Sequence, residues 1–334
     1  MTDKSTEESQ DRAAERRAKG EFVRGVSGFR HAIGEADFPA EPGRYHLFVA
    51  LNCPWCHRVT LARAVLGLTE SITMDVAFPN RTGEDDPVGE GFWEFAPARV
   101  ASLTGEALPE CTPETGTGAG LRLAVDIYAR EGGEERSLPI LYDKIAGRIV
   151  SNESAEILRM LSAHRAALGG TGADLYPEPL RAEIDALNAD IYTAINNGAY
   201  KAGFSSDQAV YAAAFTAYFD MLARLEARLS DGRPFLTGAV FTEADLRLFP
   251  TLYRHDPVYT VRMKLNGARI LDYPHLWRWL CRVYALPGVA AAGSLLHCRQ
   301  GYFGRTWNRT VPLGPLKPMP YPEAYLYPEL ALTR

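Results

Sequence analysis

A strand, a cysteine-containing turn, a helix and a second strand follow one another near the start of this chain, and this succession constrains the fold more than any other feature. Residues 45–51 are an apolar run of strand formers that ends at Asn52-Cys53-Pro54. Apolar side chains then recur at helical spacing over residues 57–68, and residues 71–78 are typical of another strand. Since a helix joins the two strands, we expect them to pair in parallel as a βαβ unit.

The next apolar segments extend this unit into an α/β domain. A short helix is expected over residues 121–130, and residues 138–143 and 147–151 predict a hairpin. Another helix is expected to begin at residues 151–154, where Ser and Asn side chains can accept hydrogen bonds from free backbone N–H groups. Residues 44–163 therefore predict the order βαβ, helix, ββα.

Helical spacing dominates the second half of the chain. From Phe215 to Leu229, apolar residues recur at steps of three and four, which indicates a long amphipathic helix. Thr242 and Asp245 have the spacing of a capping box, in which each side chain binds the backbone N–H of the other residue. Residues 177–303 therefore predict an all-helical domain.

Three segments are expected to lie outside these two domains. Residues 1–43 form an N-terminal extension whose charged first part predicts a flexible tail. Residues 79–120 are rich in Pro, Gly, Thr and Glu and form an insertion of a length that is usually functional. Residues 304–334 contain repeated prolines and predict an extended tail.

Composition and charge exclude several classes of partner. The net charge is −5, so no broad basic surface is available for nucleic acid. The apolar runs are far shorter than the ~18 residues of a membrane span. The first 20 residues lack the apolar segment of a secretory signal, and five cysteines make no dense disulfide framework in so long a chain. We therefore expect a cytoplasmic protein whose partners are neither nucleic acids nor membranes.

The turn at Cys53-Pro54-Trp55-Cys56 carries the clearest chemical signal. Cys53 stands where a strand ends and a helix begins, and the partial positive charge of a helix N-terminus favours a thiolate. Pro54 suits the first helical position, since its missing N–H costs nothing there. The pKa of a cysteine thiol at such a turn can fall from about 8.5 to ~3.5–7.5, so Cys53 is a candidate nucleophile.

Two other interpretations of this turn stay open. Cys53 and Cys56 could be half of a zinc site, although Cys111, Cys281 and Cys298 each stand alone and supply no second pair. The two thiols could also be buried and inert. A reactive thiol or dithiol at a βαβ turn is the interpretation that we favour.

Two further motifs fit a site for a peptide-like thiol. Leu138-Pro139 begins a predicted strand, and a cis proline there would turn the preceding backbone outward as an edge for an extended ligand. A trans proline on an edge strand is the alternative. Glu153-Ser154 at a helix N-terminus offers N–H groups and a hydroxyl to a carboxylate, although alone it is only a capped helix.

Together these residues resemble the glutathione transferases, and more closely the glutathionyl-hydroquinone reductases of the Xi class. The resemblance runs in unbroken order over residues 20–304. It implies a thioredoxin-like domain with a mixed four-stranded sheet, followed by an all-α domain. The matching strings are Gly20-Glu21-Phe22-Val23-Arg24, Cys53-Pro54-Trp55, Trp93-Glu94-Phe95, Leu138-Pro139-Ile140-Leu141-Tyr142-Asp143, Ile149-Val150-Ser151-Asn152-Glu153-Ser154, Ile195-Asn196-Asn197-Gly198-Ala199-Tyr200, Thr242-Glu243-Ala244-Asp245 and Asp256-Pro257-Val258-Tyr259.

The resemblance also implies an activity and a set of site residues. Cys53 would attack the sulfur of an S-glutathionyl hydroquinone, form a mixed disulfide with glutathione and release the hydroquinone. It implies glutathione as cosubstrate, an aromatic quinol conjugate as substrate, no metal and a homodimer. Tyrosines would line the aromatic pocket and hydrogen-bond the quinol oxygens, and five residues would hold glutathione. These are Tyr200, Tyr302 and Tyr259 for the quinol, and Trp93, Leu138, Pro139, Glu153 and Ser154 for glutathione.

One residue departs from the family pattern. Members usually carry Ala where this chain has Cys56, so Cys56 is a candidate resolving thiol that could capture the mixed disulfide internally. This departure keeps two alternatives open, a glutaredoxin-like thioltransferase or dehydroascorbate reductase that uses both thiols, and a different low-molecular-weight thiol such as mycothiol. A third alternative is a non-catalytic carrier of aromatic ligands, in which Cys53 is incidental.

Overall fold

The computed structural model describes residues 20, 25, 27–83, 90–104 and 120–304. The predictions of a flexible start and of an extended tail fall on residues 1–19 and 305–334, outside the described residues, as does Cys111. The chain divides into two compact units. The first, here called the sheet unit, comprises Ser27–Arg181 and the segment from Cys281, and the second, the helical unit, comprises Ala182–Leu280 and the residues before Ser27.

A four-stranded mixed sheet forms the centre of the sheet unit, as the sequence predicts. Its strands are β1 (Tyr45–Val49), β2 (Thr73–Val76), β3 (Ile140–Asp143) and β4 (Arg148–Ser151), in the order β2-β1-β3-β4. Strand β1 runs parallel to β2 and antiparallel to β3. All five residues of β1 are buried, which explains why the segment is a continuous apolar run and not an alternating one.

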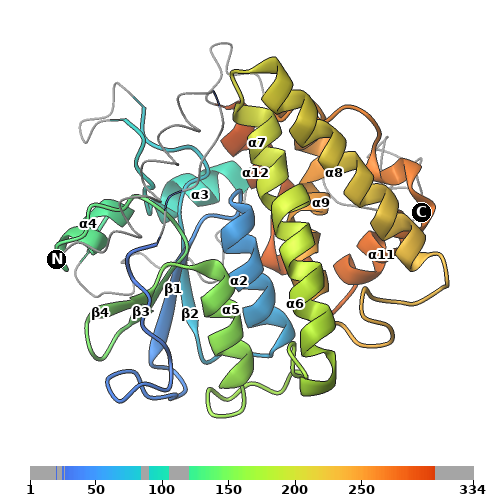
Figure 1. Ribbon diagram of the computed structural model, residues 1–334. Coiled ribbons are helices and arrows are strands. Elements are labelled where there is room, and N and C mark those ends of the chain that lie inside the picture. Colours follow the sequence, from blue (N-terminus) through green and yellow to red (C-terminus); the bar gives the residue numbers. More distant parts are fainter. Residues whose placement is uncertain (1–19, 21–24, 26, 84–89, 105–119, 305–334) are drawn as a thin grey trace, which may run out of the picture. The chain divides into compact units, whose positions relative to one another are not determined.

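Five α-helices accompany the sheet within the described part of this unit. Helices α2 and α5 lie side by side in Figure 1, and α2 leads directly from the Cys53 turn. The predicted caps of α5 are wrong, because the capping side chain is Glu153, whose carboxylate accepts a hydrogen bond from the Ala155 N–H at 3.1 Å. The helices are α2 (Pro54–Val65), α3 (Pro97–Thr104), α4 (Ala124–Ala129), α5 (Ser154–Ala163) and α12 (Leu295–Phe303).

Part of the N-terminal extension covers the outer edge of β4. Arg30 forms an antiparallel bridge with Ser151, and the His31 N–H donates to the Val150 carbonyl at 2.9 Å. The Phe29 ring packs against Tyr128 with ring centroids 5.5 Å apart. These contacts pair backbone groups that an edge strand would otherwise leave open.

Helix α12 packs against the turn that carries Cys53, although more than 200 residues separate them in sequence. The Cys298 thiol donates to the Leu51 carbonyl at 3.7 Å, and the Thr60 hydroxyl donates to the Ala292 carbonyl at 2.6 Å. A Cβ on Gly301 would lie 2.9 Å from the carbonyl oxygen of Pro79, so only glycine permits this approach. These contacts explain why the segment from Cys281 groups with the sheet unit and not with the helices that precede it.

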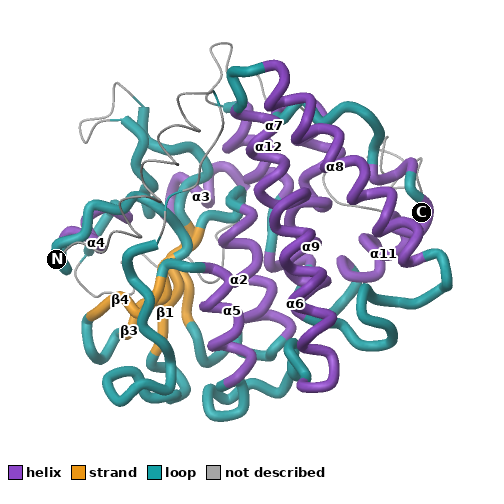
Figure 2. Tube along the Cα trace, in the orientation of Figure 1, coloured by secondary structure: helices purple, strands orange, loops and turns teal. Residues whose placement is uncertain are grey.

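Helices and loops make up the helical unit (Figure 2). The predicted amphipathic helix is confirmed as α8, which buries Tyr218, Leu222, Leu225 and Leu229 along one face. None of the described helices is long and apolar enough to cross a membrane. The α-helices are α6 (Arg181–Asp190), α7 (Asn197–Phe204), α8 (Gln208–Leu229), α9 (Glu243–Arg254), α10 (Thr260–Arg262) and α11 (Pro274–Tyr284), with π-helical turns at Ile191–Asn196 and His255–Tyr259.

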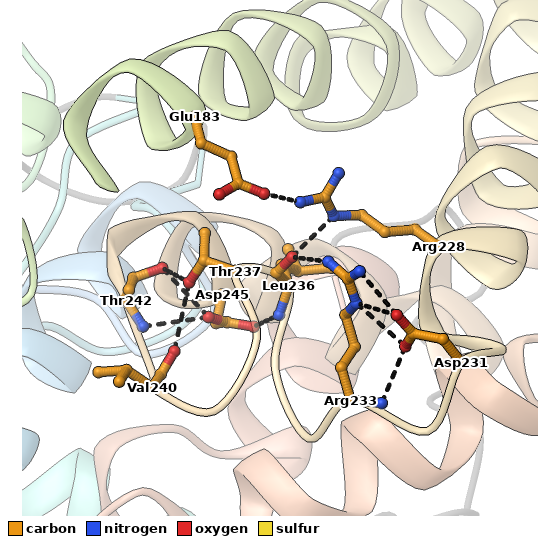
Figure 3. Close-up of polar contacts among 9 residues, drawn as sticks. All are labelled: Glu183, Arg228, Asp231, Arg233, Leu236, Thr237, Val240, Thr242 and Asp245. Carbon is orange, nitrogen blue, oxygen red and sulfur yellow. Dashed lines mark hydrogen bonds and ion pairs between the residues drawn. The ribbon is translucent and has the colours of Figure 1, made fainter. Parts of the chain in front are cut away.

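The predicted capping box at the start of α9 is confirmed, and its carboxylate does more than cap the helix. Asp245 is fully buried, and burial raises the pKa of its carboxyl to about 6. One of its oxygens accepts from the Leu236 N–H at 2.8 Å, and the other accepts from the backbone and hydroxyl of Thr242 (Figure 3). The oxygen that binds Leu236 also accepts from the Trp279 indole at 2.8 Å. Asp245 therefore ties the loop before α9 to α9 and α11.

Asp245→Asn should destabilise the protein by about 2 kcal/mol, because an amide nitrogen would face the Thr242 N–H where a carboxylate oxygen now accepts it. The measurement is the urea midpoint of unfolding at a pH well above 6, where the carboxyl is ionised. Asp231→Asn is the control, because Asp231 pairs with Arg233 in the same region but is half-exposed (Figure 3). Equal midpoints for the two variants would contradict this account.

Gly301→Ala should push α12 away from the Cys53 turn, because the added methyl group overlaps Asn52 and the Pro79 carbonyl. We expect a loss of ~1–3 kcal/mol in the free energy of unfolding and faster maleimide labelling of Cys298, located by peptide mass spectrometry. Gly83→Ala is the control, because a Cβ there has no neighbour within 4 Å among the described residues. Unchanged stability and labelling in Gly301→Ala would show that α12 does not pack as described.

Candidate active site at the start of helix α2

Cys53 is the N-cap residue of α2. Its backbone is extended, with φ −82° and ψ 122°, and its carbonyl accepts the first helical hydrogen bond from His57 at 3.0 Å. Pro54 follows at the start of the helix, as the sequence predicts. Because Cys53 is the N-cap residue, its sulfur lies near the positive end of the helix. The side chain does not accept the cap hydrogen bond, and it is partly exposed, so a ligand can reach it.

The loop before β3 lies against this thiol. The peptide bond between Leu138 and Pro139 is cis, which answers a question that the sequence left open. The Cys53 Sγ lies 3.8 Å from the carbonyl oxygen of Leu138, and both Leu138 and Pro139 are buried. Three of the residues that the sequence singled out are therefore brought together here.

Glu153 and Ser154 form the start of α5, as the sequence predicts. The Glu153 carboxylate also has a hydrogen-bond partner, Ser27, that the sequence did not predict. The Glu153 carboxylate accepts from the Ser154 hydroxyl at 3.4 Å and also from the Ser27 hydroxyl at 3.4 Å. Ser154 is fully buried, whereas Glu153 is partly exposed. Ser27 was missed by sequence reasoning, because it lies in an irregular segment where no periodicity or spacing marks a residue.

Trp93 is held in the described part of the insertion. Its side chain is 7% exposed, and the Arg81 guanidinium lies over its ring, 4.7 Å from the centroid. The Trp93 carbonyl accepts from the Ala124 N–H at 3.0 Å, which fixes this strand of the insertion to the start of α4. The neighbouring Glu94 is buried and pairs with Arg122 at 2.7 Å. Arg81 was also missed, since an arginine in a polar stretch ordinarily suggests a solvent-exposed residue.

The three predicted tyrosines fall in different units. Tyr302 is on α12 in the sheet unit, next to the Gly301 that packs on Asn52, and it is partly exposed. Tyr200 and Tyr259 lie together in the helical unit with ring centroids 6.4 Å apart and planes at 77°. Tyr200 is partly exposed but Tyr259 is fully buried, so Tyr259 packs against the Tyr200 ring from inside the fold.

Within residues 27–83, 90–104 and 120–304, no group of three or more His, Cys, Asp or Glu side chains is arranged to hold a metal ion. Cys56 is fully buried one turn into α2, and Cys298 is fully buried in α12. Burial raises the pKa of the Cys281 thiol to about 12, so that thiol is a poor nucleophile near neutrality. Cys53 is thus the best-placed nucleophilic thiol among the described residues.

Comparison with known proteins places this geometry in a family. Residues 52–164 match the glutathione S-transferase N-terminal domain, and residues 208–282 match the glutathione S-transferase C-terminal domain. The chain is 39% identical over 306 residues to the glutathionyl-hydroquinone reductase PcpF of Sphingobium chlorophenolicum, covering 90% of this chain and 92% of that protein. It is 38% identical to the glutathionyl-hydroquinone reductase YqjG of Escherichia coli, covering 91% of this chain and 92% of that protein.

Solved structures agree with the sequence relatives. The glutathione-bound structure of Escherichia coli YqjG is similar with a TM-score of 0.76 and 35% identity, covering 92% of this chain and 100% of that chain. The glutathione transferase Xi of Phanerochaete chrysosporium is similar with a TM-score of 0.75 and 36% identity, covering 89% of this chain and 94% of that chain. On this evidence the protein belongs to the glutathionyl-hydroquinone reductase family, the Xi class of the glutathione transferases.

Proposed function

We propose that this protein is a thiol-dependent reductase that removes glutathione from S-glutathionyl hydroquinones. The observation that carries the proposal is the partly exposed Cys53 at the N-cap of α2, beside the Leu138 carbonyl, in a chain 39% identical to a protein named as such a reductase. A thiolate is the form of cysteine that attacks sulfur, and a helix N-terminus favours it.

The proposed reaction has two steps, and in each of them a thiolate attacks a sulfur atom. The Cys53 thiolate attacks the sulfur of the conjugate, so a sulfur–sulfur bond forms as the carbon–sulfur bond to the ring breaks. The electron pair of that bond stays on the ring carbon, which takes a proton and leaves as the hydroquinone. A second glutathione thiolate then attacks the mixed disulfide, restores Cys53 and leaves as oxidised glutathione.

Five residues are proposed to hold the glutathione moiety: Trp93, Leu138, Pro139, Glu153 and Ser154. The start of α5, with the Ser154 hydroxyl and the Glu153 carboxylate, offers N–H groups and a counter-charge to the γ-glutamyl end. The backbone at Leu138 offers an extended edge beside the thiol, and Trp93 offers a ring next to a guanidinium. The glutathione-bound structure of the relative YqjG supports glutathione as the cosubstrate. A panel of thiols that includes mycothiol tests whether another carrier serves better.

The tyrosines are proposed to act on the quinol. Tyr302 and Tyr200 are partly exposed, and a phenol can donate a hydrogen bond to a quinol oxygen as negative charge develops on the ring. Tyr259 is fully buried, so we assign it the positioning of Tyr200, against which its ring packs. The homodimer that the family resemblance implies stays a prediction.

A second candidate function is favoured by Cys56. A glutaredoxin-like thioltransferase or dehydroascorbate reductase would use Cys53 and Cys56 as a dithiol. A carrier of aromatic ligands without catalysis is the third. The three candidates differ in whether free hydroquinone is released and in which thiol is needed for turnover.

Cys53→Ser should lower kcat/KM for hydroquinone release by about 10³-fold or more, equivalent to ~4 kcal/mol of transition-state stabilisation, because a serine hydroxyl cannot form the mixed disulfide. The measurement is chromatography of free hydroquinone from a glutathionyl conjugate in the presence of glutathione. Cys281→Ser is the control, since its thiol is half-buried with a raised pKa. Turnover that survives in Cys53→Ser would favour the carrier or an uncatalysed route.

Tyr302→Phe and Tyr200→Phe should each lower kcat by about 10²-fold while leaving the Cys53 adduct with glutathione intact, because only the donor to the quinol oxygen is lost. Steady-state kinetics and intact mass spectrometry give the two readouts. Tyr211→Phe is the control, because the Tyr211 hydroxyl is exposed and donates to the Lys264 carbonyl at 2.8 Å. Wild-type kcat in both variants would remove the tyrosines from the mechanism.

A further inference from the structure

The first turn of α2 places two thiols on one side of the helix. Cys53 is the N-cap residue, and Cys56 lies three positions further on. In regular helix geometry, residues three apart have Cα atoms about 5 Å apart. A disulfide spans Cα separations of about 4.4–6.8 Å, so the spacing of these two positions is compatible with a bridge.

The two thiols differ sharply in exposure. Cys53 is partly exposed, whereas Cys56 has an exposed fraction of 0%. A bulky conjugate can therefore reach only the Cys53 sulfur. The Cys56 sulfur is shielded from electrophiles in solution.

Cys56 lies among other buried residues. The Tyr128 ring is fully buried, its hydroxyl donates to the Ser137 carbonyl at 3.0 Å, and the Asn152 amide donates to that hydroxyl at 3.2 Å. Burial raises the pKa of the Tyr128 phenol to about 12, and Cys56 acts on that phenol electrostatically, so both groups belong to the same buried region. The adjacent His57 is fully buried against Gly293 of the α12 segment.

We infer that Cys56 resolves the Cys53–glutathione mixed disulfide from inside the protein, so that the catalytic cycle passes through a Cys53–Cys56 disulfide. The inference rests on the proposed function for its substrate. In this step the Cys56 thiol gives up its proton and attacks the Cys53 sulfur. The bond from Cys53 to glutathione breaks as the bond between the two cysteines forms, and glutathione leaves as a thiolate that takes the proton.

The bridged protein then needs a reductant, and the glutathione of the proposed reaction supplies it. One glutathione thiolate opens the bridge as a mixed disulfide, and a second removes that glutathione as oxidised glutathione, which restores both protein thiols. The overall stoichiometry is unchanged, since one conjugate and one glutathione still give one hydroquinone and one oxidised glutathione. What changes is that the first glutathione leaves before any external thiol arrives.

A single turnover without added thiol tests this inference. The reduced protein is mixed with one equivalent of a glutathionyl hydroquinone, quenched with acid, alkylated and examined by intact and peptide mass spectrometry. A parallel sample receives oxidised glutathione, which loads Cys53 without any quinol chemistry. The variants are Cys56→Ser, Cys56→Ala as a second small substitution, and Cys298→Ser as the control, because Cys298 is equally buried beside the same turn but on α12.

In both samples the wild-type protein and Cys298→Ser should end with Cys53 and Cys56 joined and protected from alkylation. They should release one glutathione per chain from the conjugate and two from oxidised glutathione, because there the first leaves when Cys53 is loaded and the second when Cys56 attacks. Both Cys56 variants should instead keep glutathione on Cys53. Their release of free glutathione from the conjugate should be at least about tenfold lower, and from oxidised glutathione they should release only the one that leaves when Cys53 is loaded. A stable glutathione adduct on wild-type Cys53 after hydroquinone release would overturn the inference and leave the proposed function standing. Bridge formation from oxidised glutathione without any hydroquinone release from the conjugate would contradict the proposed function and support the inference.

Discussion

The start of helix α2 is the constraint on which the rest of this structure depends. The chain leaves β1, donates from the Cys53 N–H to the Ala50 carbonyl at 2.9 Å and enters the helix with its first carbonyl already bonded to His57. A thiol pKa two units below the ordinary value requires about 2.7 kcal/mol of preference for the thiolate. A helix terminus supplies typically ~0.3–1 and at most about 2 kcal/mol of this preference. The geometry of this turn therefore decides the chemistry.

Segments distant in sequence hold that turn in place. Gly301 of α12 packs on Asn52. The loop at Leu138 leads into β3, the strand next to β1, and its carbonyl lies beside the Cys53 sulfur. The N-terminal extension reaches the start of α5 through the hydrogen bond from Ser27 to Glu153. The same packing that buries α12 leaves Tyr302 partly exposed beside the turn, so core packing and placement of the site residues have one cause.

Much of the fold and of the candidate site was predictable from the sequence, because local sequence patterns indicate local structure. The apolar run before Cys53 gives β1, and the Thr242 and Asp245 spacing gives the capping box of α9. The cap of α5 was mispredicted, since Ser and Asn are the commoner capping residues but Ser151 here accepts from the Glu153 N–H and Asn152 donates to Tyr128. The grouping of α12 with the sheet unit depends on close contacts at Gly301, which no periodicity encodes.

The central claim is that Cys53 is a thiolate near neutral pH, and its alkylation rate measures this most directly. The rate of iodoacetamide modification at Cys53 is followed across pH by peptide mass spectrometry, with Cys281 in the same sample as an internal reference for a thiol of raised pKa. We expect the modification rate of Cys53 to rise with a midpoint on the acid side of neutrality. A midpoint at or above about 8.5, the value of an ordinary cysteine, would contradict this expectation.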